Sequence, residues 1–133
     1  MEYLLDTNIC IYIIKKRPIN VFEKFKSLSI GSIGISSITL AELQYGIMKS
    51  SYPDRNREAL DKFITPLEIV DFDYNATVEY GKIRADLERN GIPIGPLDML
   101  IAAHARSRDL VLVTNNEKEF KRISGLKVEN WIN

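Results

Sequence analysis

Cysteine and histidine are nearly absent from this chain of 133 residues, which contains only Cys10 and His104. A single cysteine cannot form an internal disulfide, and this composition suits a reducing compartment. Because nothing close in the sequence would activate Cys10, we interpret it as a buried structural thiol. One histidine argues against a metal site or nuclease centre built on histidines, and we expect His104 to pack or to hydrogen-bond rather than to act as a general base.

Long apolar runs and an excess of one charge are also missing. No run approaches the roughly 20 residues that span a bilayer, and the chain starts without the basic segment of a signal peptide. We therefore expect a cytoplasmic protein that has no membrane segment. The 18 basic residues balance the 18 acidic residues, which disfavours a protein that coats nucleic acid through overall charge but leaves room for a local basic face.

Short apolar runs alternate with longer helical patterns along the chain, and we find no repeat or linker. The length fits one domain comprising residues 1–133. Strands alternating with helices predict an α/β fold whose central, mostly parallel sheet is flanked by helices. We predict strands near 3–5, 33–37, 67–72 and 110–113, an edge strand near 128, and helices near 9–14, 22–28, 39–47, 53–64, 73–90, 96–105 and 119–123.

Several residues indicate where these helices begin and end. Asp73 can cap a long helix that Gly91 stops, and Pro96 fits the first turn of the next helix. The stretch 39–42 has the spacing of a capping box, in which the Glu42 side chain reaches back to Thr39 at the helix start. Farther on, we expect Trp131 to pack the C-terminal segment rather than to stack on a nucleic-acid base.

Acidic residues fall at one edge of the predicted sheet. Asp6 follows the first strand, Glu42 lies in the first turn after the second strand, and Asp98 lies in the first turn of the helix before the fourth strand. Sites in parallel sheets form beyond the carboxyl ends of the strands, so these carboxylates should converge. They would repel one another unless a cation joined them, and oxygen ligands suit Mg²⁺ or Mn²⁺. Possible further members of the site, just after the fourth strand, are Thr114, Asn116 and Glu119.

Each acid also has a purely structural interpretation. Asp6 can cap the first helix, Glu42 can belong to the capping box, and Asp98 can interact with a helix dipole. Capping is compatible with metal binding, and all three acids lie on the predicted functional edge. The combination therefore favours a carboxylate metal site, and a pair of bound metals can hydrolyse a phosphodiester.

Four ordered blocks of sequence carry a resemblance to a known family. They are Leu-Asp-Thr-Asn at 5–8, the stretch 36–46, the stretch 95–105, and the stretch 112–120 continued by 125–131. With these blocks the chain resembles the PIN domains, and within them the VapC toxins of bacterial type II toxin–antitoxin pairs. The resemblance covers essentially the whole chain in matching order and spacing.

This resemblance implies a PIN fold and a Mg²⁺-dependent endoribonuclease, in which Asp6, Glu42 and Asp98 occupy the positions of the metal-binding acids. Many PIN domains carry a fourth acid where Asn116 stands here. Either Asn116 donates a neutral oxygen, or Glu119 reaches the site from the next turn, or a second metal is weakly held. The Thr114 hydroxyl can orient a water or a ligand.

The resemblance also implies a substrate and partners. The blocks at 95–105 and 114–120 look like the branch of VapC toxins that cuts the anticodon region of initiator tRNA. Hydrolysis would leave a 5′-phosphate and a 3′-hydroxyl. The implied partners are a second copy of the chain, forming a homodimer, and a VapB-type antitoxin with a DNA-binding end and a segment that fills a groove of the toxin.

Four other functions compete with this one. A haloacid-dehalogenase phosphatase would need a second Asp at position 8, where Asn stands, and a response-regulator receiver would need paired acids at the first strand. Both are disfavoured. A non-catalytic binding or autoregulatory module with the same fold remains an alternative that the intact acids argue against. A DNA-cutting nuclease of the same superfamily is disfavoured because the chain has no added DNA-binding domain.

Overall fold

The structure is a computed structural model that describes residues 1–132. Its strands are β1 (Tyr3–Leu5), β2 (Ile33–Ser36), β3 (Glu68–Val70), β4 (Val111–Val113) and β5 (Val128–Glu129). Its helices are α1 (Thr7–Lys15), α2 (Ile19–Ser27), α3 (Ser37–Met48), α4 (Pro53–Ile64), α5 (Tyr74–Arg89), α6 (Pro96–Ser107) and α7 (Glu117–Phe120). Within this part of the chain, no helix is long and apolar enough to cross a membrane.

The five strands form one sheet in the order β3-β2-β1-β4-β5, and every pairing is parallel. In the central strand, Leu4 pairs with Gly34 of β2 on one side and with Leu112 of β4 on the other. The chain builds β1, β2 and β3 outward in one direction and then returns to place β4 beside β1. Ligand sites of open parallel sheets lie at such a switch in direction, which here falls between β1 and β4.

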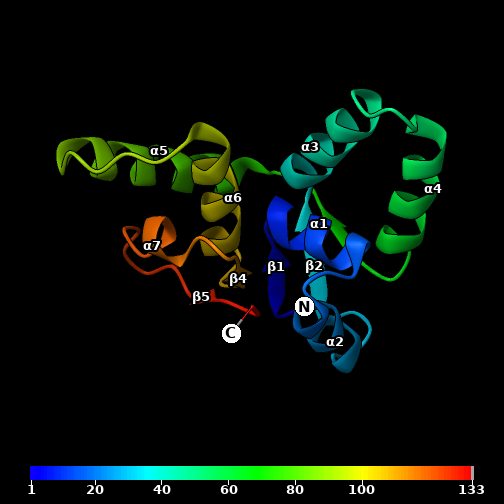
Figure 1. Ribbon diagram of the computed structural model, residues 1–133. Helices are drawn as coiled ribbons and strands as arrows, with labels where there is room; N and C mark the ends of the chain where they lie inside the picture. Colours follow the sequence, from blue (N-terminus) through cyan, green and yellow to red (C-terminus); the bar gives the residue numbers. More distant parts are fainter. Residues whose placement is uncertain (133) are drawn as a thin grey trace.

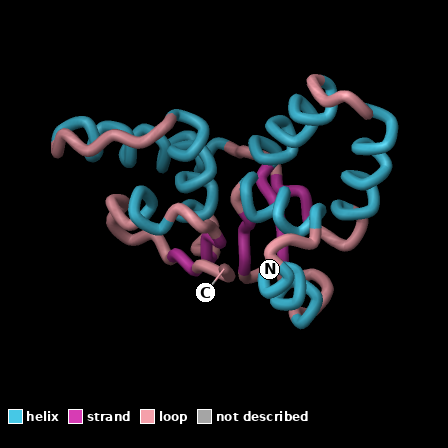
Figure 2. Tube along the Cα trace, viewed as in Figure 1, coloured by secondary structure: helices cyan, strands magenta, loops and turns pink. Residues whose placement is uncertain are grey.

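Helices cover both faces of the sheet, as Figures 1 and 2 show. Consecutive strand residues point to opposite faces, so Leu4 packs with the cluster under α5, α6 and α7 while Leu5 packs with the cluster under α1 to α4. Leu112 and Val113 divide in the same way. The continuous apolar strands are therefore explained by burial on two faces, as parallel sheets require.

The helix ends confirm some predicted signals and correct another. Asp73 accepts a hydrogen bond from the Ala76 N–H at 3.0 Å, and Gly91 adopts a left-handed φ of 67° just past the end of α5. The predicted capping box at 39–42 is wrong. Helix α3 begins two residues earlier, capped by Ser36, whose side chain accepts the Ile38 N–H at 3.1 Å. The strand ends earlier than expected, so Ser36 reaches the cap position before Thr39.

The last part of the chain closes the sheet as an edge strand, as predicted. The Trp131 ring lies edge-on to Tyr3 at 5.6 Å between ring centroids, and its indole N–H donates to Glu129 at 2.9 Å. Only 4% of Trp131 is exposed, which confirms its packing role. The short helix before it, α7, begins at Glu117 instead of the predicted 119, so Glu119 lies inside its single turn.

Replacing Trp131 with alanine should remove the anchor of the β5 edge. We expect Trp131→Ala to lower the free energy of unfolding by about 3–5 kcal/mol, the usual cost of deleting a buried large aromatic side chain. Chemical denaturation measures this loss, and Trp131→Phe, which keeps most of the apolar contact, should lose clearly less. Equal stability of Trp131→Ala and the wild type would contradict the packing role.

Candidate active site

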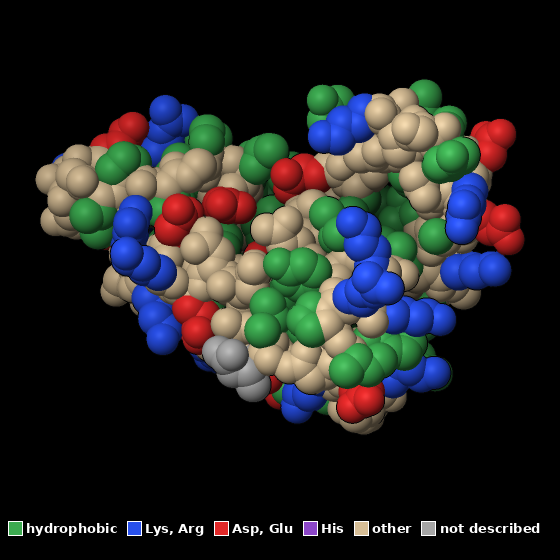
Figure 3. Space-filling model, viewed as in Figure 1, with side chains coloured by type: hydrophobic (Ala, Val, Ile, Leu, Met, Phe, Trp, Pro, Cys, Tyr) green, Lys and Arg blue, Asp and Glu red, His purple; other side chains and the backbone are tan. Residues whose placement is uncertain are grey.

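Three acidic side chains predicted from the sequence come together at the carboxyl edge of the sheet. Asp6 directly follows β1, Glu42 lies in the second turn of α3, and Asp98 lies in the first turn of α6. Besides burial, the charges of Asp98 and Glu42 raise the pKa of Asp6, and the charge of Glu42 contributes to the raised pKa of Asp98. Figure 3 shows acidic side chains gathered on this face between α3 and the helices α6 and α7.

Asp6 is the most enclosed of these acids, with 5% of the residue exposed. Burial is the main cause that raises the pKa of Asp6 to about 6, and hydrogen bonds from the Thr114 hydroxyl and the Ile9 N–H oppose the rise. The Ile9 N–H lies 2.9 Å from Asp6 Oδ1, so Asp6 also caps α1, as predicted. One carboxylate therefore combines capping with a position at the switch between β1 and β4.

Asp98 is half-buried, and burial raises its pKa, followed by the charges of Glu119 and then Glu42. Because the charge of Glu119 raises the pKa of Asp98, Glu119 belongs to the same cluster as the three acids. Asn116 is engaged differently, because its backbone N–H donates to the fully buried Thr114 hydroxyl at 2.9 Å. Thr114 thus links Asp6 to the start of α7, the turn that carries Glu119.

Sequence reasoning missed the residue that holds Glu42. The Thr7 hydroxyl donates to Glu42 Oε1 at 2.6 Å, a contact between side chains 35 positions apart. This bond occupies the carboxylate that the capping box would have turned back toward Thr39. The only local signal was a hydroxyl residue directly after Asp6, at the start of a helix that faces the acids.

The donor set suits a hard divalent cation. Among residues 1–132, no three His, Cys, Asp or Glu side chains already lie close enough to enclose an ion. Mg²⁺ does not require such an enclosure, since it keeps several waters and binds through one or two carboxylates together with substrate phosphates. Asp6 and Asp98, oxygen donors that repel one another across the edge of the sheet, fit that mode of binding.

The thiol is excluded from this chemistry. Cys10 is free and fully buried, and burial raises the pKa of its thiol well above the ordinary value. It is therefore a neutral core side chain, as predicted. His104 has no exposed surface either, so it does not contact a substrate.

The known proteins most informative about this chain share its fold and much of its sequence. The profile of the PIN domain family matches residues 3–126. A protein of Shigella flexneri named tRNA(fMet)-specific endonuclease VapC is 48% identical over 131 residues, which cover 98% of each chain. The chain belongs to the PIN-domain family and, within it, to the VapC ribonucleases. The α/β fold with a parallel sheet is thereby the PIN fold that the sequence predicted.

Solved structures agree with this assignment. VapBC2 of Rickettsia felis, determined bound to a DNA fragment from its promoter, superposes with a TM-score of 0.93 at 48% identity and covers 98% of this chain and 99% of that one. The DNA-bound VapBC of Salmonella typhimurium also gives a TM-score of 0.93, at 49% identity over 98% of each chain. The VapC architecture therefore extends over nearly the whole length of both chains.

The buried charge of Asp6 should make the metal-free protein less stable at neutral pH. Because the pKa of Asp6 is higher in the folded chain than in the unfolded chain, the ionised carboxylate opposes folding above about pH 6, while Asp6→Asn keeps a capping oxygen without the charge. We expect Asp6→Asn to raise the free energy of unfolding at pH 7 by about 1–3 kcal/mol.

Denaturant titrations in EDTA measure this difference between pH 4 and pH 8. The advantage of Asp6→Asn should shrink as the pH falls through 6 toward 4, since Asp6 then binds its proton in both states. A variant that is less stable than the wild type at every pH would show that burial of the Asp6 charge does not destabilise the folded protein.

Proposed function

We propose that this protein is the toxin of a type II toxin–antitoxin pair, a Mg²⁺-dependent endoribonuclease that hydrolyses a phosphodiester in the anticodon region of initiator tRNA. The observation that carries the proposal is the convergence of Asp6, Glu42 and Asp98, from three separate elements, at the switch between β1 and β4. VapC relatives that are named as ribonucleases support the same chemistry.

We assign Asp6 and Asp98 as the metal-binding carboxylates, with Glu42 beside them. Nucleases of the PIN family generally depend on a divalent metal. Such a metal, when bound, would acidify a water molecule and offset the charge of the phosphate. The protein's own contribution is orientation: hydrogen bonds from the Thr114 hydroxyl and the Ile9 N–H favour the ionised form of Asp6 against burial, and the Thr7 hydroxyl binds Glu42.

We also assign Glu119, rather than Asn116, as the fourth acidic member of the site. Glu119 lies close enough to raise the pKa of Asp98, while the Asn116 backbone serves Thr114. Asn116 lies after β4 at the start of α7, and Glu119 lies farther along, within the single turn of that helix. A carboxylate three residues later in the chain thereby supplies the charge that the amide lacks.

The initiator-tRNA substrate rests on two relatives, from Shigella flexneri and Salmonella typhimurium, which are named tRNA(fMet)-specific endonucleases and are 48% and 49% identical to this chain. An acidic site recessed at the edge of a sheet suits a single-stranded loop, whose unstacked nucleotides can bring one phosphate to the carboxylates. A paired RNA helix would present a rigid surface to the same site.

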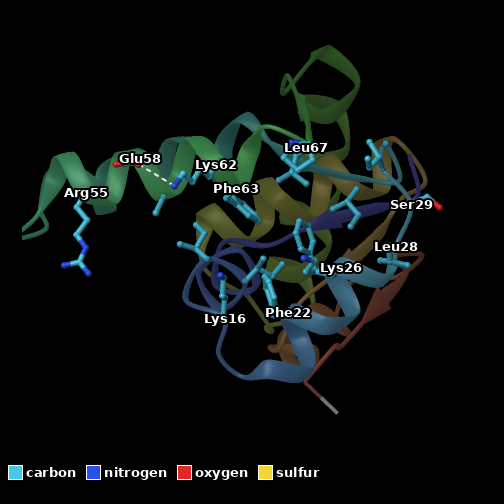
Figure 4. Close-up of a pocket in the computed structure, with 18 residues that line it drawn as sticks. Lys16, Phe22, Lys26, Leu28, Ser29, Arg55, Glu58, Lys62, Phe63 and Leu67 are labelled. Carbon is cyan, nitrogen blue, oxygen red and sulfur yellow. Dashed lines mark ion pairs between the residues drawn. The ribbon is translucent and has the colours of Figure 1, made fainter.

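We propose that a VapB-type antitoxin covers a groove whose lining does not include these acids. The groove has a volume of about 710 Å³ and lies among α1, α2 and α4, with an apolar lining that includes Ile14, Phe22, Phe25 and Phe63. In Figure 4, Phe22 of α2 and Phe63 of α4 both face the space between their helices. The groove would take the apolar face of an amphipathic helix.

The charges around this groove favour an acidic partner. The lining includes Lys16, Lys26, Arg55 and Lys62 but only one acid, Glu58, which lies 3.5 Å from the Lys62 ammonium group. Lys16 and Lys26 also flank the Phe22 ring, at 5.4 and 5.6 Å from its centroid. An antitoxin segment with acidic residues beside its apolar face would complement this rim.

A second exposed apolar surface supports a homodimer. Tyr45 and Met48 of α3 and Tyr74 of α5 are each more than 60% exposed, and Tyr52 follows α3 with similar exposure. Their exposure rules out burial of Tyr45 and Met48 in this chain's own core. Large apolar side chains that are this exposed support a contact with a second copy of the chain.

Cleavage of purified tRNAs tests the enzymatic proposal. We expect the wild type to cut initiator tRNA at one site with Mg²⁺, to spare elongator tRNAs, and to be inactive in EDTA. Asp98→Asn should lose at least about a hundredfold in rate because it removes a metal ligand, and Glu119→Gln at least about tenfold, whereas Asn116→Ala should stay within about threefold of the wild type.

The variants, purified in the same way, guard against a contaminating ribonuclease. Cleavage of another RNA would keep the nuclease and discard the tRNA substrate. A wild type as inactive as Asp98→Asn on a broad RNA panel, while both bind an antitoxin, would instead establish the binding module. Loss of activity in Asn116→Ala but not in Glu119→Gln would reverse the assignment of the fourth position.

A charge placed inside the groove should separate antitoxin binding from catalysis. Ala59 of α4 lines the groove, so Ala59→Glu puts a carboxylate against the apolar lining. We expect antitoxin affinity, measured by calorimetry, to fall at least about tenfold with tRNA cleavage unchanged. Asn56→Glu, an exposed change on the same helix that does not line the groove, is the control. Equal antitoxin affinity for both variants would place the antitoxin elsewhere.

A further inference from the structure

A buried polar contact joins two elements that carry the candidate acids, and the proposed chemistry leaves it unexplained. His104 of α6 and Ser36, at the junction of β2 and α3, have no exposed surface, and His104 Nδ1 lies 2.8 Å from Ser36 Oγ. The two residues are 68 positions apart in the sequence. Burying a hydroxyl and an imidazole is unfavourable unless they satisfy each other, so the contact constrains how α3 and α6 pack.

The other bond of Ser36 leaves its hydroxyl proton available for this hydrogen bond. Ser36 Oγ already accepts the Ile38 N–H at 3.1 Å as the cap of α3. Its hydroxyl proton is then free to be donated to His104 Nδ1, which requires a neutral ring protonated on Nε2. Burial lowers the pKa of His104, in keeping with a neutral ring. Nε2 makes no hydrogen bond of normal geometry within residues 1–132, although the nearby Asp71 backbone favours the protonated ring.

A third segment is fastened at the same point. The Phe72 ring, in the connection between β3 and α5, lies edge-on to the His104 ring at 5.4 Å and 78°. The Phe72 N–H donates to Ser37 Oγ at 3.1 Å. The two serines at the end of β2 thus hold α6 and the β3–α5 connection, and the three segments cannot shift independently at this junction.

The junction is placed to control the distance between two acids. Asp98 lies six residues before His104 on α6, and Glu42 lies six residues after Ser36 along α3. Six residues of helix span about 9 Å, and a helix of this length behaves as a rigid rod. A bond that fixes where α6 meets the start of α3 therefore fixes where the two carboxylates stand relative to each other.

We propose that His104, acting through Ser36, is a positioning residue that sets the separation of Glu42 and Asp98 and thereby the metal affinity and turnover of the site. The proposal rests on the nuclease function proposed above. His104 touches neither substrate nor metal, and its effect reaches the site through α3 and α6. A displacement of about 1 Å at a catalytic centre can cost about a hundredfold in rate.

Two substitutions at this position separate hydrogen bonding from packing. His104→Leu fills much of the space but gives the Ser36 hydroxyl no acceptor. His104→Asn can place its side-chain oxygen where Nδ1 stands and so restore the acceptor. Ile83→Ala, which makes a cavity in the core cluster beneath α5, α6 and α7, is the control for lost stability, because it leaves the junction intact.

Mn²⁺ binding by calorimetry and tRNA cleavage are measured on each protein, with folding checked by circular dichroism. We expect His104→Leu to bind Mn²⁺ at least about fivefold more weakly and to turn over at least about tenfold more slowly, with tRNA affinity in EDTA unchanged. His104→Asn should stay within about threefold of the wild type in both. Ile83→Ala should lose stability but keep wild-type Mn²⁺ affinity and turnover per folded molecule.

Other results would overturn the proposal. Wild-type Mn²⁺ affinity and turnover in folded His104→Leu would reduce the bond to a stabilising contact, and so would the same losses in Ile83→Ala. If His104→Leu does not fold, failure of folded His104→Asn to retain both properties decides against the proposal. A wild type that binds Mn²⁺ but cuts no RNA removes the nuclease function alone, with Mn²⁺ affinity still testing the junction. A wild type that binds no Mn²⁺ overturns both.

Discussion

The arrangement of this protein depends on one constraint, a carboxylate held out of water between β1 and β4. Asp6 must follow β1 directly for its backbone N–H to donate to Val113 at 3.0 Å and its side chain to meet Thr114. Burial there makes the charge unfavourable by itself and is the main cause that raises the pKa of Asp6 to about 6. Asp6 is nevertheless charged at neutral pH, although its charge destabilises the fold. The charge therefore serves a function other than stability. Each neighbouring acid adds to the repulsion at Asp6. A cation bound between these carboxylates would therefore stabilise the folded protein most at this position.

The two faces of the sheet support different residues around Asp6. The cluster beneath α5, α6 and α7 supports Asp98 and Glu119, while the cluster beneath α1 to α4 supports Glu42 and also forms the floor of the apolar groove. Because adjacent residues of β1 and of β4 belong to different clusters, these central strands connect the two faces without mixing their side chains. A partner bound in the groove would contact α1, which begins at Thr7 and is capped by Asp6. The proposed antitoxin surface and the acidic site thus share a helix although their lining residues are distinct.

The sequence predicted correctly those features that depend on residues close together in the chain. The strand ends that carry Asp6 and Thr114, the cap at Asp73 and the packing of Trp131 follow from apolar runs and from residues that begin or end elements. The capping box failed because Thr39 and Glu42 have the correct spacing while Ser36, at the end of a strand that ends earlier than expected, takes the cap first.

The partner of Glu42 is Thr7, and the partner of Ser36 is His104, at separations of 35 and 68 residues. No local pattern encodes such pairs, which depend on how helices pack across the sheet. The same limit left Asn116 and Glu119 as equal candidates from the sequence, and the proposal for Glu119 depends on its electrostatic effect on Asp98, which no local pattern predicts.

A centre built from carboxylates must act on a substrate that is itself a polyanion, and the balance of charge decides which RNA can reach it. With 18 basic and 18 acidic residues, the chain has no overall attraction for phosphate backbones. Acids at the mouth of the site repel any phosphate that approaches without compensation. An RNA segment is then accepted only where its shape lets one phosphate enter while the flanking nucleotides find contacts elsewhere, which a flexible, unstacked loop permits and a continuous duplex does not. On this reasoning, repulsion removes duplex RNA before any base is contacted, while the choice of one anticodon loop among the tRNAs requires contacts to the bases of that loop.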